Sequence, residues 1–382
     1  MPPDNSELGS LRVQIDAVDD QILALLDRRA EVVRRVGEIK RERRETFHVP
    51  QRERAVLERL TNAAKGAFPR EAVRPVFREI MSACLSLESP LVVSYPGPEA
   101  TFSHLAGRTR FGLSAQYAPA VSLGEVFRAV GRGADYGVVP VEEAAEGLVT
   151  HALDHFIDSD LLNVIIVGEI VIPAAHALLT HSGATAGVER VYAHPVAAAR
   201  CAAGLVEAVR GASIVAAPSA AAAAALARDD ARGAAVAPAL AGELFDLAVA
   251  RARLDDGPAD VARFLVLGRV APPPTGADAT SLLVGLDDQP GRLAEVLDRL
   301  AAAGLNLRRI ASRPTDRRGL RDLFFVDLDG HRDVPACREV LERLAGELPL
   351  FKVLGSYPRD GVSEAKGVGE AKGVSEAKGD RA

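Results

Sequence analysis

Three basic residues lie along one stretch near the N-terminus, and their types and spacing suggest that they bind an anion. Arg29 occupies a position in an apolar seam where the spacing predicts an aliphatic side chain. Because a guanidinium is costly to remove from water without a partner, we expect Arg29 to face an anion in a packed interior. Lys40 follows 11 residues later (40 − 29) and returns to nearly the same helix face, roughly 16 Å along the axis. The alternative is that Arg29 snorkels to solvent and that the other cations are solvated charges.

Arg12 cannot reach the same small ligand as Arg29 if both come from one straight helix. It lies 17 residues earlier (29 − 12), which corresponds to roughly 25 Å along the axis and about 100° around it. If all three cations serve one kind of site, Arg12 must serve the site of a second copy. The spacing therefore predicts an intertwined helical dimer.

A long helix must carry these cations, and two shorter helices complete the unit. The stretch from Leu11 to Lys40 places apolar residues every three or four positions, which predicts one helix with a buried seam. Pro50 suits the first turn of a second helix, and Pro69 opens a third on which Cys84 and Glu88 share a face. The seam consists of Leu11, Ile15, Val18, Ile22, Leu25, Val32, Val36 and Ile39.

From residue 91 the sequence changes to short β-branched runs that alternate with helical runs. This pattern predicts an α/β domain with a largely parallel sheet. Residues 271–279 contain three consecutive prolines and suit a linker, and residues 280–357 follow the ferredoxin-like order βαββαβ. Residues 358–382 repeat a glycine-rich charged hexad, and we expect them to be disordered. The predicted strands of the α/β domain begin near Leu91, Asp135, Val164, His176, Arg190 and Phe264.

Composition narrows the functional classes. The 382 residues are enough for two or three domains, and a hydrophobic content of 48% is sufficient for real cores. The net charge is −6 and the basic residues are scattered among acids, so neither nucleic acid nor a membrane is an expected partner. The N-terminus is polar and has no apolar signal core. The three cysteines are far apart and lack metal-type spacing, which predicts reduced thiols in the cytoplasm and no metal site.

The motifs resemble those of the bifunctional chorismate mutase–prephenate dehydratases of phenylalanine biosynthesis. The stretch LRVQIDAVDDQILALLDRRAEVVRRVGEIK is similar to the mutase motif, whereas GPEATFS, DYGVVPVEEAAEG, YAHPVAAA and ARF resemble dehydratase motifs. DQPGRL, NL and SRP in the third unit resemble an ACT regulatory domain. The resemblance implies three domains and no cofactor. They are an all-α mutase domain over residues 1–90, a two-lobed α/β dehydratase-type domain over 91–270, and the ACT domain over 280–357.

The resemblance also implies how the helical domain binds chorismate, a dicarboxylate that rearranges to prephenate without covalent help from an enzyme. Arginines would clamp the two carboxylates in a bidentate way. Lys40 would donate to the breaking ether oxygen, and Glu53 would accept a hydrogen bond from the ring hydroxyl. The implied pocket residues are Arg12 of a second copy, Arg29, Lys40, Arg52, Glu53 and Glu88, with Val49 and Cys84 lining the pocket.

Two positions of this pocket depart from the family pattern. Val49 stands where some relatives carry an aspartate, which removes one polar contact to substrate. Glu88 stands where others carry a glutamine. A charged Glu88 would repel a developing oxyanion, whereas a protonated one would donate to it. We therefore expect a raised Glu88 pKa and mutase activity that falls as the pH rises through it. The alternative is an exposed glutamate at a helix end.

The dehydratase motifs lack several of their usual polar groups. Ala193, Val196 and Ala262 replace the serine, glutamine and threonine of the family, and Glu143 replaces an asparagine. Dehydration with decarboxylation needs a proton delivered to the departing hydroxyl, which alanine and valine cannot supply. We expect dehydratase activity to be weak or absent. Three roles stay open for the domain: a scaffold, a binder of prephenate through its arginine, or a decarboxylase that spares the hydroxyl. The implied site residues are Thr101, Phe102, Ser103, Glu142, Ala262, Arg263 and Phe264.

In the third unit, a turn and the start of a helix would contact an amino-acid effector such as phenylalanine. Turn amides and a helix N-terminus suit a carboxylate. Ala311 replaces the usual glutamate, which weakens the expectation of feedback, and the alternative is a dimerisation module only. The implied effector residues are Gln289, Pro290, Gly291, Leu293, Asn306, Leu307, Ser312 and Arg313.

Three functional interpretations follow from the whole sequence. The first is a dimeric chorismate mutase fused to a dehydratase-type domain of doubtful activity and an effector domain. The second is the complete bifunctional enzyme, with other groups replacing the lost ones. The third is a non-catalytic regulator that binds metabolites of the aromatic pathway.

Overall fold

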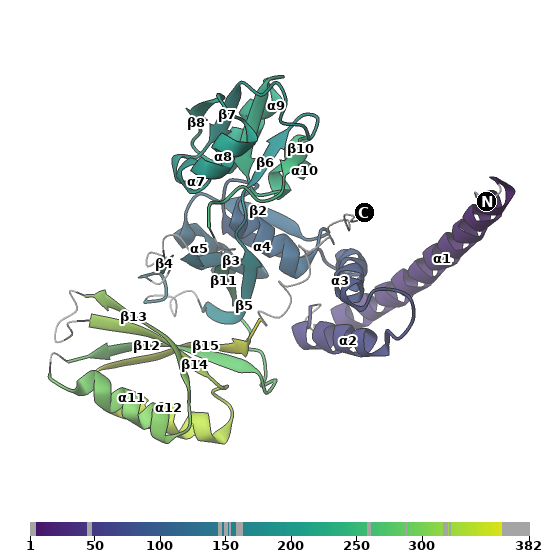
Figure 1. Cartoon of the computed structure of the whole chain (residues 1–382). Coiled ribbons are helices and arrows are strands. Elements are labelled where there is room, and N and C mark those ends of the chain that lie inside the picture. The colour runs from purple at the N-terminus through teal and green to yellow at the C-terminus, as the bar shows by residue number, and fades with distance from the viewer. Residues whose placement is uncertain are drawn as a thin grey trace, which may run out of the picture.

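The computed structural model contains three units in chain order: a helical unit, a two-lobed α/β unit and a small sheet with two helices (Figure 1). None of the helices that it describes is long and apolar enough to cross a bilayer. The expected tail lies outside the described residues from residue 361 onward, and so does Asp288 of the predicted effector turn. The described residues are 5–43, 48–143, 147–148, 152, 154–157, 163–257, 261–287, 289–315, 320 and 322–360.

The first unit consists of the three predicted helices and confirms the all-α prediction. α1 (Asn5–Arg43) contains the predicted cation-bearing stretch. α2 (Pro50–Ala63) begins at a proline, whose missing N–H needs no partner in a first turn. α3 (Arg70–Ser86) follows Pro69 and packs against both α1 and α2.

The apolar seam of α1 is exposed, so its predicted burial does not occur within one chain. α1 has 39 residues, whereas α2 has 14 and α3 has 17, and most of α1 projects from the body of the molecule (Figure 1). No described element of the same chain is therefore long enough to cover the seam. The exposed fractions are 49% for Leu11, 58% for Ile15, 52% for Val18, 49% for Ile22, 64% for Leu25, 55% for Val32, 41% for Val36 and 49% for Ile39.

The middle unit has two lobes, each built on one sheet. The first sheet has the order β2-β1-β3-β11-β5, with β4 (Gly147–Leu148) paired to β3. β1 runs parallel to β2 and β3, but β11 runs antiparallel to both β3 and β5. The main elements of this lobe are β1 (Val92–Pro96), α4 (Phe102–Phe111), β2 (Gln116–Ala120), α5 (Leu123–Arg132), β3 (Tyr136–Glu143), β5 (Ile165–Pro173) and β11 (Val261–Gly268).

The prediction of a largely parallel sheet is wrong, because the chain leaves the first lobe along β5 and returns along β11 in the opposite direction. The second lobe is also mixed. Its sheet has the order β10-β6-β9-β7-β8, in which only the β7–β8 and β7–β9 pairs are parallel. Its elements are β6 (Ala177–Thr180), β7 (Arg190–Ala193), α7 (Pro195–Arg200), α8 (Ala202–Ala208), β8 (Ser213–Ala216), α9 (Ala220–Arg228), β9 (Gly233–Ala237), α10 (Leu240–Phe245) and β10 (Ala248–Arg251).

The third unit has the predicted βαββαβ order. Its antiparallel sheet has the strand order β13-β14-β12-β15, and both helices cover one face of that sheet (Figure 1). The opposite face packs on the first lobe and shares one apolar core with it. The elements are β12 (Asp278–Leu286), α11 (Arg292–Ala302), β13 (Leu307–Pro314), β14 (Asp322–Asp329), α12 (Pro335–Glu347) and β15 (Leu350–Pro358).

Two features fix the third unit against the first lobe. A Cβ at Gly355 would overlap the backbone carbonyl of Ile166, so only glycine lets β15 approach β5 this closely. Arg263 of β11 is buried at the same interface. Its Nε lies 2.8 Å from Glu169 and its Nη1 lies 2.9 Å from Asp327 of β14. A buried guanidinium with two carboxylates holds the two units in one register.

Candidate functional site

A cavity of about 160 Å³ lies between the three helices and the edge of the first lobe. It brings together seven of the eight residues that the sequence assigns to the mutase pocket. Arg12 is the eighth: it is exposed on α1 and does not belong to the described lining of this cavity. The seven residues are Arg29, Lys40, Val49, Arg52, Glu53, Cys84 and Glu88.

Each helix contributes residues from one face. Arg29 and Lys40 come from the half of α1 that packs on α3, and the Nη1 of Arg29 lies 3.5 Å from the backbone carbonyl of Ile80. Gly37 makes room for Glu88, just after α3, because a Cβ there would lie 2.9 Å from the Glu88 Cγ. A glycine on α1 therefore allows the carboxyl group of Glu88 to lie close to the cations.

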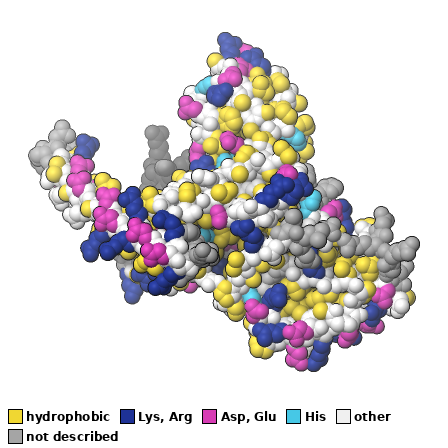
Figure 2. Space-filling view, turned by 180° about the vertical axis from the view of Figure 1, so that it is seen from behind, with side chains coloured by type: hydrophobic (Ala, Val, Ile, Leu, Met, Phe, Trp, Pro, Cys, Tyr) yellow, Lys and Arg dark blue, Asp and Glu magenta, His cyan; other side chains and the backbone are white. Residues whose placement is uncertain are grey.

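Positive charge exceeds negative charge among the lining residues. Arg29, Lys40, Arg52 and Arg78 carry four positive charges, whereas two glutamates carry at most two negative charges (4 − 2 = 2). Charges of one sign in a partly enclosed, low-dielectric cavity attract an ion of the opposite sign. A surplus of at least two favours an anion such as a small dicarboxylate. Figure 2 shows basic and acidic side chains gathered over the helical unit, whereas the upper lobe in that view has fewer charges.

The environment of Glu88 favours its protonated form. Burial raises its pKa, and the nearby charges of Lys40 and Arg41 oppose this rise without cancelling it. Its buried Oε2 has no hydrogen-bond partner among the described residues. A carboxyl group in this state can donate a proton or a hydrogen bond to a ligand in the cavity.

The predicted dehydratase residues divide between two faces of the first lobe's sheet. Ala262 and Phe264 of β11 face an apolar core that Phe102, at the start of α4, also contacts. Thr101 caps α4 by accepting a hydrogen bond of 3.3 Å from the backbone N–H of His104. Ser103 is buried in the first turn of the same helix.

Glu142 and Arg263 instead face the third unit. Glu142 forms an ion pair of 2.8 Å with Arg309 of β13, and Arg263 is paired with Glu169 and Asp327. Arg263 and Ala262 thus lie on opposite faces of the sheet, because successive residues of β11 point to opposite faces. Binding of prephenate through Arg263 stays a prediction.

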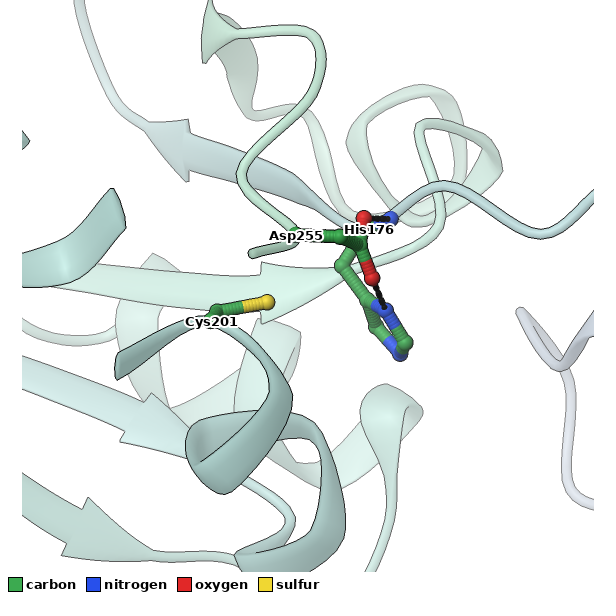
Figure 3. A group of neighbouring side chains, drawn as sticks. All are labelled: His176, Cys201 and Asp255. Carbon is green, nitrogen blue, oxygen red and sulfur yellow. Dashed lines mark hydrogen bonds and ion pairs between the residues drawn. The ribbon is translucent and has the colours of Figure 1, made fainter. Parts of the chain in front are cut away.

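A second polar cluster lies where the chain crosses from the first lobe to the second (Figure 3). The ligand-type atoms of His176, Cys201 and Asp255 lie within 4.8 Å of one another. Asp255 accepts hydrogen bonds from the backbone N–H of His176 at 2.6 Å and pairs with its Nδ1 at 2.7 Å. Burial and the nearby carboxylate of Asp255 raise the pKa of Cys201 to about 12. The cluster contains a hydrogen-bonded His–Asp pair beside a buried thiol.

The predicted effector residues do not all face one site. Gly291, with φ of 85°, precedes α11 in an exposed turn. Asn306 donates a hydrogen bond of 2.8 Å to Asp329, and Arg313 makes a two-pronged ion pair with Asp154 of the middle unit at 2.6 and 2.8 Å. Of the remaining predicted residues, Gln289, Pro290 and Ser312 are exposed, whereas Leu293 and Leu307 pack against the core of the third unit.

Comparison with known proteins decides the family. Family models match the chain for chorismate mutase type II over residues 11–89, prephenate dehydratase over 93–272 and the ACT domain over 280–346. The bifunctional chorismate mutase/prephenate dehydratase of Aquifex aeolicus is 41% identical, and the match covers 92% of this chain and 98% of that protein. The chain belongs to the bifunctional chorismate mutase/prephenate dehydratase family. The protein of the same name from Pseudomonas aeruginosa is 37% identical, with 93% of this chain and 99% of that protein covered.

A solved member of the dehydratase group resembles the middle and third units. The prephenate dehydratase of Arthrobacter aurescens, in complex with L-Phe, is 34% identical and has a TM-score of 0.63. The match covers 70% of this chain and 90% of that one. In this chain the dehydratase-type unit is followed by the ACT unit, and the mutase helices precede both.

Sequence reasoning missed two titratable residues of the mutase cavity. Arg78 lines it, and its spacing from Met81 and Leu85 on α3 follows one helix face, so the periodicity could have indicated it. His48 also lines the cavity, from the connection before α2. Nothing in the sequence signals its role, because its contacts include a residue of another domain.

We expect the pKa of Glu88 to lie above its ordinary value and to rise further in a Lys40→Met variant. Removing a nearby cation disfavours the charged carboxylate, so the direction of the change is upward. NMR titration of the protein with carbon-13-labelled glutamate carboxyls measures it. A Lys65→Met variant, altered at an exposed position after α2, should leave the value unchanged. An ordinary Glu88 pKa, or no response to loss of Lys40, contradicts this account.

Proposed function

We propose that the helical cavity is a chorismate mutase site that converts chorismate to prephenate in aromatic amino acid biosynthesis. One observation carries the proposal: cations from α1, α2 and α3 meet in one cavity whose surplus charge matches a dicarboxylate. The chain's likeness to two bifunctional enzymes over more than nine-tenths of its length supports the same assignment.

The proposed mechanism needs no covalent step by the protein. Arg29 and Arg52 clamp carboxylates and hold the reactive conformer of the substrate, which lowers the entropic part of the barrier. Lys40 stabilises the charge that develops on the breaking ether oxygen. Glu88 assists it as a protonated donor, so activity falls as the pH rises through the raised pKa of Glu88.

We also propose that two copies of the chain complete each site. Arg12 lies on α1 roughly 25 Å from Arg29, too far to reach the same ligand within one chain. The seam of α1 exposes eight aliphatic side chains, and covering each would contribute about 1 kcal/mol. A second copy of α1 supplies a matching apolar surface and brings its own Arg12 to the cavity.

Mixing two inactive variants tests this arrangement. Chains carrying Arg12→Ala and chains carrying Arg52→Ala should each lose most mutase activity, measured as the loss of chorismate absorbance. After the two are unfolded and refolded together, half of the dimers are mixed and each mixed dimer holds one intact site, so about a quarter of wild-type activity should return. Activity that stays at the level of the separate variants contradicts a shared site.

For the middle domain, we propose weak or absent prephenate dehydratase activity. Ala262 occupies the position of the family's threonine, and only 1% of its surface is exposed, within an apolar core. The replaced serine and glutamine positions, Ala193 and Val196, offer no proton donor either. The domain then serves mainly as a support for its two neighbours.

Restoring the hydroxyl should raise dehydratase activity. We expect Ala262→Thr to increase the formation of phenylpyruvate from prephenate about tenfold or more, because positioned proton transfer contributes at least that much. Val261→Thr is the matched control, since it adds the same hydroxyl on the opposite face of β11, where the side chain is 44% exposed. Rapid phenylpyruvate formation by the unmodified chain contradicts the proposal.

We propose that the ACT unit binds an amino-acid effector at the turn before α11, and that the protein is cytoplasmic. The free buried cysteines suit a reducing compartment, and the similar dehydratase from Arthrobacter aurescens is in complex with L-Phe. Because Ala311 lacks a carboxylate and Arg313 is paired with Asp154, we expect weak binding of phenylalanine, with a Kd of about 1 mM. Isothermal titration calorimetry measures it, and binding in the low micromolar range contradicts the expectation.

A further inference from the structure

The wall of the mutase cavity is not made by the helices alone. Leu91 and Phe111 of the middle unit belong to its lining. The Oγ of Ser82 on α3 donates a hydrogen bond of 2.8 Å to the backbone carbonyl of Phe111. Glu79 of α3 accepts a hydrogen bond of 2.8 Å from the backbone N–H of Leu113. The helical unit is therefore docked on the first lobe beside the cavity.

A hydrogen-bond chain crosses this boundary and ends on a predicted catalytic carboxylate. The Nε2 of His48 lies 3.0 Å from the Oε2 of Glu53, and its Nδ1 lies 2.8 Å from the hydroxyl of Tyr136. The His48 and Glu53 side chains are both buried, 8% and 14% exposed. Tyr136 is the first residue of β3 and belongs to the dehydratase-type domain.

We propose that Tyr136 and His48 are positioning residues for the mutase reaction: the middle domain holds the Glu53 carboxylate toward the substrate through His48. This inference rests on the assignment of the helical cavity as the mutase site. It makes the dehydratase-type domain part of the mutase site, although Tyr136 itself does not belong to the described lining of the cavity.

Hydrogen-bond chemistry gives the chain one direction. Burial raises the pKa of Tyr136 to about 12, so its hydroxyl keeps its proton and can donate to the Nδ1 of His48. With Nδ1 as the acceptor, the Nε2–H of His48 is donated to the Glu53 carboxylate. The role of Tyr136 is therefore to hold the His48 ring in the orientation that binds Glu53.

Tyr136 is held rigidly because it belongs to a strand of the first sheet. The ring of Tyr136 stacks on Phe111 with centroids 4.8 Å apart, and it meets the ring of His48 edge-on at 5.4 Å. Gly137, the next residue along β3, pairs with Ser94 of β1 and with Leu267 of β11. A side chain fixed by packing and a paired strand can hold a catalytic group within the narrow tolerance that catalysis needs.

The groups around Glu53 show what the hydrogen-bond chain contributes to its pKa. Burial alone would raise the pKa of Glu53, but the hydrogen bond from His48 and the charges of Arg110 and Arg78 bring it below its ordinary value. An ionised Glu53 can accept a hydrogen bond from the ring hydroxyl of the substrate. The titratable and charged groups of the surrounding elements are Arg29 and Lys40 of α1, His48, Arg52 of α2, Arg78 of α3, Glu88 after α3, Arg110 of α4, Asp135 before β3 and Tyr136 of β3.

The test compares Tyr136→Phe with Tyr192→Phe in the full chain. Tyr192 is the matched control, because its hydroxyl also bonds to a side chain, Asp230 at 3.0 Å, but in the second lobe. We expect Tyr136→Phe to lower mutase kcat/KM about three- to tenfold, the effect of one lost hydrogen bond, with no effect of the control. The acid limb of the pH profile should also move to higher pH, because Glu53 loses a cause of its lowered pKa. A merely structural role would lower the rate without moving that limb.

A double-mutant cycle with His48→Leu distinguishes loss of the hydrogen-bond chain from a general loss of native structure. Tyr136→Phe should have little further effect once His48 is leucine, since the chain is already broken. Additive losses, or an unmoved acid limb in Tyr136→Phe, overturn the inference even if Arg52→Ala and Glu53→Gln abolish the mutase. If those two variants keep wild-type activity, the cavity is not the mutase site and the inference falls with that assignment.

Discussion

Unbalanced positive charge in the helical cavity is the constraint on which the rest of the structure depends. Four cations face two carboxyl groups there, and one of these, Glu88, is in an environment that favours its neutral form. Such a site is costly to assemble unless an anion completes it. The helix that carries Arg29 and Lys40 has 39 residues, and its apolar seam is exposed within one chain. The charge supports the proposal of a dicarboxylate in the cavity, and the exposed surface supports the proposal of a second copy along α1.

The middle domain links the sites of the other two domains through one strand. β3 begins at Tyr136, beside the mutase cavity, and Glu142 near its other end pairs with Arg309 of the ACT domain. The neighbouring strand β11 carries Arg263, whose guanidinium joins Glu169 to Asp327 across the same interface. The middle domain thus contacts both of its neighbours through two adjacent strands.

Periodicity and turn chemistry predicted the elements well. The three-to-four spacing of α1, the prolines that begin α2 and precede α3, and the βαββαβ order all appear in the structure. Predictions failed where the outcome depended on what lies outside the local sequence. The seam of α1 is exposed because no described element of the same chain is long enough to cover it. The first sheet is mixed because β11 returns from the second lobe, and this direction leaves no local signal.

For the candidate site too, local patterns predicted some residues, whereas contacts between domains could not be predicted. Spacing along α1 indicated Arg29 and Lys40, and the family resemblance implied the other five of the seven residues that share one cavity. The motif around Arg263 does not reveal which face of β11 this residue occupies or that Asp327 lies there. His48 was missed because Tyr136, its partner, follows 88 residues later. The positions of Arg263 and His48 depend on contacts between domains. A local sequence pattern cannot predict such contacts.

The most direct test of the central claim is a structure of the full chain with a cyclic dicarboxylate ether that mimics chorismate but cannot rearrange. The account predicts that its two carboxylates contact Arg29, Arg52 and Arg12 of a second copy, within a dimer in which the α1 seams cover one another. A ligand bound elsewhere, or bound in this cavity of a single chain with Arg12 still in solvent, would contradict it.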